Sequence, residues 1–465
     1  MIQMKERTLT SFISDAKKQA TEKGEPQLMS WTKKIEPLSI IDAFKRTEKF
    51  GKNRLFWSNS NQDFILFGFG TTKVIIAESD RFEQLEQKWA ALVEDALIYN
   101  PYEEQGTGLT AFGGMSFDPL RERSNLWTNF PMSQLTVPNY LIVYETDDYY
   151  LTVNQYINQT DHIDNIMKEI NEVEQLLLTG VNVPNIGEQK IDYHIEKDPE
   201  GWKRSVQKAV DTIQADKAQK IVLARELRLK LHDRVQVSSF IEKLLESQPQ
   251  SYIFAFEQGE DCFLGASPER LVQVREDTLL STCLAGTAPR GKNEEEDVEI
   301  AKRELLHDPK NREEHDHVVQ MIKSSVAPFC HDIYIPDKPV VLTLRNLQHL
   351  YTPVTATLND GVSVFKLIEV LHPTPALGGV PTDKALQFIR DEEQFDRGWY
   401  GAPIGWLDYN GNTEFAVAIR SGLAQADEMS LFAGCGVMAD SDPEKEYEET
   451  AVKFLPMLTI LEDNE

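Results

Sequence analysis

The segment 263–291, FLGASPERLVQVREDTLLSTCLAGTAPRG, constrains the fold more than any other stretch of the chain. Its apolar and β-branched residues, with Gly and Pro at intervals, are typical of a strand, a reverse and a second strand. Pro268 precedes Glu269, and because Pro fixes φ and removes a backbone donor, the sequence predicts a rigid corner that carries this carboxylate. Thr287 follows Gly286, where the missing Cβ leaves room against the backbone. A plain hairpin, in which Pro and Gly serve only the turns, would show the same pattern.

The length of the chain, 465 residues, exceeds that of an ordinary single domain, although large sheets flanked by helices reach this size on a shared core. In 1–179, strand-like runs such as 54–58 alternate with helix-like segments. The segment 180–199 has no periodicity and is rich in turn formers, which indicates a boundary. We therefore predict an N-terminal half, 1–190, and a C-terminal half, 191–465, within one large body.

The charge of the chain limits its partners. It carries 48 Lys and Arg against 75 Asp and Glu, a formal net charge of -27, which disfavours nucleic acid or an anionic membrane surface as a partner. Four Cys without a C-x-x-C spacing predict neither a disulfide framework nor a zinc cluster. No apolar run approaches the roughly 18 residues of a membrane span, and the first residues lack the apolar core of a signal peptide. We expect a cytoplasmic protein.

A lysine begins one of the predicted strands. The run KIVLAREL, 220–227, alternates as a β-strand and is apolar on both faces, which predicts neighbours on both sides. Lys220, Val222 and Ala224 share one of these faces. Desolvation at the mouth of such a strand favours the neutral amine, which could serve as a general base. The alternative is a lysine whose amine reaches water from the strand end.

A predicted helix begins near Pro309 and places a carboxylate on its apolar face. The residues at four-residue spacing along this face are Glu314, Val318, Ile322 and Val326. Glu314 thus occupies the first position of a stripe otherwise suited to the core. A carboxylate placed there needs a partner.

A second predicted helix begins at Pro443 and has Glu446, Glu449 and Lys453 on one side. Two neighbouring like charges cost stability unless a cation offsets them, so this side could hold Mg²⁺. A solvated acidic face is the alternative. If the two helices meet, Glu314 and a carboxylate of the second helix could bind one Mg²⁺ that keeps several waters.

Motifs in unbroken order from about Pro199 onward resemble those of the chorismate-utilising enzymes, most closely their isochorismate synthase branch. The motifs are KIVLARE, FLGASPER, LAGTAPRG, REEHDHVV, LHPTPALGG, RGWYGAPIGW, the strand of Arg420, and GCGVMADSDPEKEYEETAVK. In the N-terminal half only the general size and FGGMSF are similar. The resemblance implies an α+β fold, a large single body of stacked antiparallel β-sheets flanked by helices, in which the two halves share one core.

The resemblance also implies roles in the isomerisation of chorismate to isochorismate. Lys220 is then the base that activates water for attack on C2, and Glu269 is the acid that protonates the departing 4-hydroxyl. These roles agree with the partly desolvated strand end and the rigid corner. Glu314 and Glu449 correspond to the Mg²⁺ ligands of the family, with Glu446 in support, and the metal would neutralise charge on the substrate.

The remaining pocket residues also come from the resemblance. Arg420 corresponds to the residue that holds the enolpyruvyl carboxylate of the substrate, a task that suits a planar bidentate donor. The other implied contacts are Gly286, Thr287, His349, Tyr400, the backbone of Gly434 to Gly436, and Lys453.

Two positions separate the branches of the family. Enzymes that make aminodeoxychorismate with ammonia carry a lysine nucleophile where this chain has Ala285, and anthranilate synthases usually have Gln at the position of Lys220. The residues present here favour water as the nucleophile. Salicylate synthases, which go on to eliminate pyruvate, share both features and are the alternative. A non-catalytic scaffold is disfavoured, since it has no reason to keep five polar groups converging on one cleft. The pathway served, and the choice between monomer and homodimer, stay open.

Overall fold

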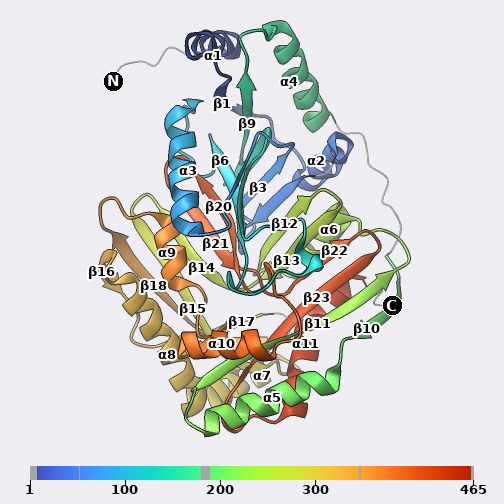
Figure 1. The fold of residues 1–465 in the computed structure, drawn as a ribbon, viewed down its shortest axis with the longest axis vertical. Coiled ribbons are helices and arrows are strands. Elements are labelled where there is room, and N and C mark those ends of the chain that lie inside the picture. The colour runs from blue at the N-terminus through green and yellow to red at the C-terminus, as the bar shows by residue number, and fades with distance from the viewer. Residues whose placement is uncertain (1–7, 52, 180–188, 345–346, 462–465) are drawn as a thin grey trace.

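The computed structural model describes residues 8–51, 53–179, 189–344 and 347–461. In this part of the chain two large β-sheets are flanked by helices (Figure 1). Every described strand pair is antiparallel except the pair of β1 with β5. The predicted α+β class is confirmed.

The first sheet, sheet A, contains thirteen of the described strands. Their order across the sheet is β10 (Ile191–Glu196), β11 (Lys220–Leu231), β23 (Glu428–Val437), β22 (Ser421–Gln425), β13 (Asp261–Ser267), β12 (Tyr252–Gln258), β2 (Leu55–Ser58), β3 (Phe64–Phe69), β8 (Tyr140–Glu145), β9 (Asp148–Ile157), β1 (Gln27–Ile35) and β5 (Leu97–Tyr99), with β19 (Gly379–Val380) beside β11.

The second sheet, sheet B, contains ten described strands. Their order is β16 (Cys330–Tyr334), β18 (Leu347–Leu358), β15 (Thr278–Pro289), β14 (Arg270–Arg275), β21 (Thr413–Val417), β20 (Pro403–Asp408), β6 (Thr110–Met115), β7 (Ser133–Val137) and β4 (Lys73–Ile76), with β17 (Val340–Thr343) beside β18. In each sheet the strands of the predicted C-terminal half form one side and those of the predicted N-terminal half form the other, so both sheets extend across the two halves.

The helices of the described residues divide into three groups. Those against sheet A are α1 (Leu9–Lys23), α2 (Ile40–Arg46), α4 (Ile163–Leu178) and α6 (Val237–Ser247). Those against sheet B are α3 (Arg81–Asp95), α7 (Glu294–Ile300), α8 (Pro309–Val326) and α9 (Val364–Leu371). At the end of the molecule where β11 begins lie α5 (Pro199–Gln214), α10 (Thr382–Glu392) and α11 (Pro443–Leu461) (Figure 1).

An aromatic core lies between the two sheets, because the strands alternate their side chains. In β13, Phe263 points into the inter-sheet core, whereas the next residue, Leu264, packs on the other side with the helices of sheet A. From sheet B, Trp406 of β20 enters the same inter-sheet core. The two sheets are therefore held face to face by large apolar side chains.

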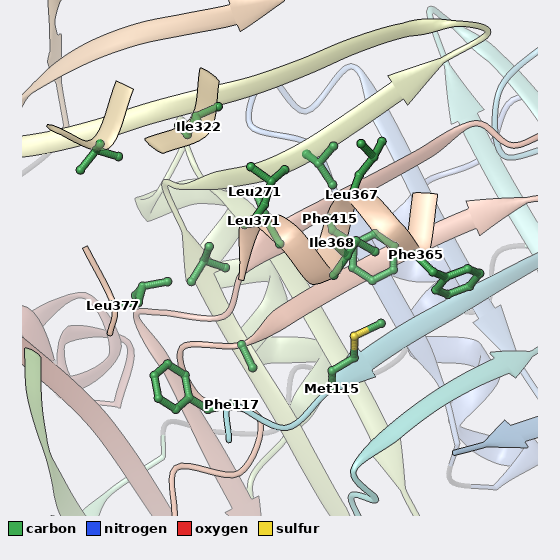
Figure 2. Close-up of a cluster of buried hydrophobic side chains, with 14 of the residues drawn as sticks. Met115, Phe117, Leu271, Ile322, Phe365, Leu367, Ile368, Leu371, Leu377 and Phe415 are labelled. Carbon is green, nitrogen blue, oxygen red and sulfur yellow. The ribbon is translucent and has the colours of Figure 1, made fainter. Parts of the chain in front are cut away.

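Another cluster of buried apolar side chains lies on the outer face of sheet B. Figure 2 shows Phe365, Leu367 and Ile368 of α9 beside Leu271 of β14 and Phe415 of β21. All of these side chains are buried. Burial of each contributes on the order of 1.5–3 kcal/mol, so the cluster holds α9 firmly on the sheet.

The segment 263–291 differs from its predicted form. It contains three strands instead of two: β13 belongs to sheet A, whereas β14 and β15 belong to sheet B. The chain crosses between the sheets at Pro268, which has no N–H with which to extend the ladder of β13. The reverse turn follows β14, where Glu276 has φ 56°. The corner at Glu269 is therefore a bridge between two sheets.

Other local predictions agree with the structure. β11 begins at Lys220 and has neighbours on both sides, and α8 and α11 begin at Pro309 and Pro443. In the predicted boundary segment, residues 180–188 lie outside the described residues, while β10 follows and pairs with β11. The division of the chain at 190 stays a prediction.

Candidate active site

One cavity of about 310 Å³ collects all the residues singled out in the sequence. Its walls come from β11, the β13–β14 corner, β15, α8, β18, β23 and α11. The predicted residues that line it are Lys220, Glu269, Gly286, Thr287, Glu314, His349, Tyr400, Arg420, Gly434, Gly436, Glu446, Glu449 and Lys453. The structure thus brings together groups that lie far apart in the sequence, while their individual roles stay predictions.

Lys220 lies at the first position of β11 and is 7% exposed. Val222 and Ala224 of the same face also line the cavity, as the strand alternation predicted. A Cβ at Gly436 on β23 would stand 2.7 Å from Cε of the lysine, so glycine there leaves room for the lysine side chain. The amine donates a hydrogen bond to Oε1 of Glu314 in an ion pair. The sequence did not reveal this partner, because Glu314 lies on α8, far from Lys220 in the chain.

Glu269 stands on the bridge between the sheets, and its backbone is fixed from both sides. Its N–H donates to Oγ of Ser267 at 3.2 Å, and its carbonyl accepts from the N–H of Val417 at 3.0 Å. The Ser267 hydroxyl in turn donates to the carbonyl of Val417 at 2.5 Å. The predicted rigid corner is confirmed.

The surroundings of the Glu269 carboxyl favour its protonated form. Burial raises its pKa to about 7, although the positive charges of Arg420 and Lys220 act in the opposite direction. The side chain is 6% exposed. A carboxyl with this pKa carries a proton in a large fraction of molecules at pH 7, which is the state a general acid needs.

The acidic wall of the cavity contains three carboxylates. Burial acts to raise the pKa of Glu314, but the ammonium of Lys220 outweighs it and lowers that pKa. Glu449 accepts from Lys453 at 2.6 Å. Glu446 accepts from the Ser441 hydroxyl at 2.6 Å through Oε1, and its buried Oε2 has no partner among the described residues.

This acidic wall fits a hard divalent cation in its chemistry. Glu314, Glu446 and Glu449 offer oxygen ligands to one cavity, and Oε2 of Glu446 is buried without a hydrogen bond within the described chain. No group of three or more His, Cys, Asp or Glu within the described residues is close enough to hold a metal ion alone. Mg²⁺ commonly takes one or two carboxylates and completes its octahedron with water and substrate oxygens, so the donor set suits it.

Another part of the cavity wall, around Thr287 and His349, is polar and neutral. The Thr287 hydroxyl and Nδ1 of His349 lie 3.1 Å apart, next to Gly286 with φ 78°. Burial lowers the pKa of His349 to about 3, with Arg420 and Lys453 acting in the same direction. Nε2 of His349 is buried and has no hydrogen-bond partner in the described residues. A neutral imidazole with a free nitrogen can donate to or accept from a bound molecule.

Arg420 and Tyr400 close the cavity near the carboxyl of Glu269. Arg420 has φ 50°, a left-handed conformation that is costly for a residue with a Cβ, and its guanidinium lies among the cavity residues. Burial raises the pKa of Tyr400, so its hydroxyl stays protonated. A Cβ at Gly434 would stand 3.3 Å from this hydroxyl.

Several lining residues escaped the sequence analysis. Lys310 and Asn311 lie on the first turn of α8, and Arg397 and Ser441 lie in loops. The two helical residues stand four and three positions before Glu314, so helical periodicity could have found them. Arg397 belongs to the motif RGWYGAPIGW, but nothing in the pattern separates it from its neighbours.

Among the residues that the structure describes, no helix has the length and apolarity required to cross a membrane.

Comparisons with known proteins extend over the whole chain. The chain is 37% identical to the isochorismate synthase MenF of Bacillus subtilis (strain 168), over 99% of this chain and 99% of that protein. It is 33% identical to the salicylate biosynthesis isochorismate synthase of Pseudomonas aeruginosa, over 95% and 92% of the two chains. The solved structure of MenF, the menaquinone-specific isochorismate synthase of Escherichia coli, has a TM-score of 0.79 at 22% identity and covers 97% of this chain and 100% of that one.

A family model described as chorismate binding enzyme matches residues 14–462. The match includes the N-terminal half, where the sequence motifs had indicated only a weak likeness. With a family model and a relative that both cover nearly all of its length, this chain belongs to the chorismate-binding enzymes.

Proposed function

We propose that this protein is an isochorismate synthase, which converts chorismate to isochorismate. The observation that carries the proposal is the presence of two candidate proton-transfer groups in one cavity. Glu269, with its pKa of about 7, and Lys220 are both buried in the wall of the same small cavity. Likeness to two isochorismate synthases over more than nine-tenths of the chain supports the same reaction.

The two groups divide the proton transfers of the reaction. The step requires Lys220 as the neutral amine, which accepts a proton from the water molecule that attacks C2 of chorismate. Glu269 gives its proton to the 4-hydroxyl, which departs as water. One hydroxyl is thus exchanged for another at a different carbon. By microscopic reversibility, Glu269 acts as base and Lys220 as acid when isochorismate returns to chorismate.

The cavity also has groups for the negative charges of the substrate. Arg420 can hold the enolpyruvyl carboxylate with a planar pair of N–H donors. Lys453, whose amine is fixed by the Gly434 carbonyl at 2.8 Å and by Glu449, adds a second positive charge. These cations make the cavity suitable for a dianion, although the net charge of the whole chain is negative.

Glu314 and Glu449, with Glu446 beside them, would hold Mg²⁺ on the lysine side of the cavity. The bound ion would supply charge neutralisation at the ring carboxylate of chorismate. The two lysines that now pair with Glu314 and Glu449 compete for the same carboxylate oxygens.

The position of Ala285 supports water as the nucleophile. Its side chain lines the cavity between Leu284 and Gly286, so no lysine amine is present there. A salicylate synthase would satisfy the same observation, because its first step is the same reaction. The two functions differ in whether pyruvate is then eliminated.

The deciding experiment is incubation of the purified protein with chorismate and Mg²⁺, followed by chromatographic resolution of the products. Isochorismate as the sole product is expected. Salicylate with pyruvate would establish the alternative, and anthranilate in the presence of ammonia would contradict water as the nucleophile. A parallel reaction with excess EDTA should show no turnover until Mg²⁺ is restored, and full activity in EDTA would contradict the proposed metal.

A further inference from the structure

The edge of β11 that faces away from β23 changes partners along its length. Near its start it pairs with β19, where Lys220 lies opposite Val380, and from Leu227 onward it pairs with β10. Between these two contacts no described strand pairs with 223–225 on this edge. A buried strand edge without partners would leave backbone N–H and C=O groups unsatisfied, so other groups must take the place of a strand here.

Side chains supply the missing partners. Nη2 of Arg397 donates to the carbonyl of Val222 at 2.8 Å, and the N–H of Ala224 donates to Oε2 of Glu393 at 3.0 Å. Nε1 of Trp202 then donates to the carbonyl of Ala224 at 3.0 Å. Arg397 and Glu393 are joined as a fork, in which Nε and Nη2 donate to the two carboxylate oxygens at 2.7 and 2.6 Å. The ion pair thus continues the ladder of β11.

Arg397 also reaches a second wall of the cavity. Its Nη1 donates to the carbonyl of Leu377 at 3.0 Å, and Leu377 lines the cavity together with Ala376. The guanidinium lies over the ring of Phe117, 4.3 Å from its centroid. The side chains of Arg397 and Glu393 are only 4% and 2% exposed. Charges buried to this degree persist only where several partners satisfy them, and here those partners belong to two walls of one site.

We propose that Glu393 and Arg397 form a positioning pair, which fixes the start of β11, and with it the amine of Lys220, relative to the wall at 376–377. The inference rests on the proposed function, because it assigns Lys220 to the reaction. Lys220 and Val222 project from the same face of one strand, so a shift of β11 carries the amine with it. A displacement on the order of 1 Å at a reacting group can cost about 10² in rate.

The chain contains a matched pair that serves as a control. Arg54 and Glu257 form a second buried fork, 4% and 7% exposed, with bonds of 3.0 and 2.6 Å from Nε and Nη2 of the arginine. The guanidinium of Arg54 lies over the ring of Phe44 at 4.6 Å. Neither Arg54 nor Glu257 lines the cavity. The two pairs therefore share chemistry and burial and differ in their relation to the site.

The test compares Arg397→Lys with Arg54→Lys. Each variant keeps the positive charge and loses the fork, so both should unfold at a similarly lowered temperature. In Arg397→Lys we expect kcat for chorismate to fall roughly 10- to 100-fold while KM stays within about threefold. Arg54→Lys should keep the wild-type kcat. Amide hydrogen exchange should accelerate in 220–224 for Arg397→Lys and stay unchanged there for Arg54→Lys.

Three results would overturn the positioning pair. They are equal kcat values in the two lysine variants, a raised KM at unchanged kcat in Arg397→Lys, which would make Arg397 a substrate ligand, and unchanged exchange in 220–224. If Arg397→Lys does not fold, Glu393→Asp replaces it, since this change draws the carboxylate back by one methylene. Glu257→Asp is then the control, and the same three results would overturn the positioning pair. If wild-type protein leaves chorismate unchanged, the proposed function fails, whereas the exchange comparison still decides whether the pair holds β11.

Discussion

Lys220 and Glu269 are buried to nearly the same degree, 7% and 6% exposed, yet their surroundings differ. Glu269 stands on the bridge between the sheets, and its carboxyl has no hydrogen-bond or ion-pair partner among the described residues. Lys220 begins β11 and donates to Glu314. Burial therefore raises the pKa of Glu269, whereas the amine of Lys220 has a carboxylate partner. The comparison teaches that equal burial does not give equal electrostatics, because a single partner can replace the lost hydration.

The largest expected effect comes from removing either group. Lys220→Ala and Glu269→Gln should each lower kcat by roughly 10² to 10⁴, the usual contribution of one general acid or base, in both directions of the reaction. Circular dichroism should show that both variants remain folded. Near-normal turnover by Lys220→Ala would mean that its pair with Glu314 is purely structural and would refute the proposed mechanism.

The next effect concerns the stability of the fold, which depends on the protonation of Glu269. Because the pKa of Glu269 is raised to about 7, its protonated form stabilises the fold fully below the pKa of the unfolded chain. This contribution is lost as the pH rises through about 7. The loss amounts to about 3 kcal/mol for a shift of this size.

Denaturant unfolding of wild type and Glu269→Gln across pH 4 to 9 measures this contribution, since glutamine cannot titrate. The free energy of unfolding of the wild type should fall relative to the variant as the pH rises. Parallel profiles for the two proteins would show that Glu269 is not held neutral by burial.

A smaller effect concerns the lysine side of the cavity. Glu449→Gln removes a predicted Mg²⁺ ligand but leaves the pair of Lys220 with Glu314 intact, whereas Glu314→Gln removes both a ligand and that pair. Each should raise the Mg²⁺ concentration for half-maximal activity by at least about tenfold. Only Glu314→Gln should also change the activity at saturating Mg²⁺, because it removes the partner of Lys220. An unchanged Mg²⁺ requirement in both variants would remove these carboxylates from the metal site.

The smallest effect is expected at the mouth of the cavity. Lys310 pairs with Asp440 at 3.1 Å, and both side chains are more than half exposed. Such pairs contribute about 0–1 kcal/mol. Lys310→Met should therefore lower kcat/KM by no more than about threefold, measured at low ionic strength. A larger loss would assign Lys310 to substrate binding.

The local parts of this site could be predicted from the sequence. The alternation of KIVLAREL places Lys220 with Val222 and Ala224, and Pro309 and Pro443 mark the starts of two helices, because these signals depend on neighbours within a few residues. The motif resemblance then named thirteen residues from distant segments that line the cavity, although it left out others such as Lys310 and Arg397.

The remaining features depend on contacts between distant segments. The pairing of Lys220 with Glu314 joins β11 to α8, and the crossing at Pro268 joins two sheets, so no local period reveals either. The pair of Glu393 and Arg397 illustrates the same limit. Its proposed role depends on the carbonyl of Val222, which Arg397 contacts, and on the N–H of Ala224, which donates to Glu393, and both lie far from the pair in sequence.

The pairing of early strands with much later ones has a consequence for synthesis on the ribosome. In sheet A, β2 lies between β3 and β12, and in sheet B, β6 lies between β7 and β20, so strands made early have open edges until much later ones emerge. Such non-local pairing slows folding and leaves apolar edges open to wrong partners. The walls formed by β23 and α11 are translated after every other wall of the cavity. A nascent chain therefore has no chance to engage its small-molecule ligand early, and ligand binding cannot assist the first stages of its folding.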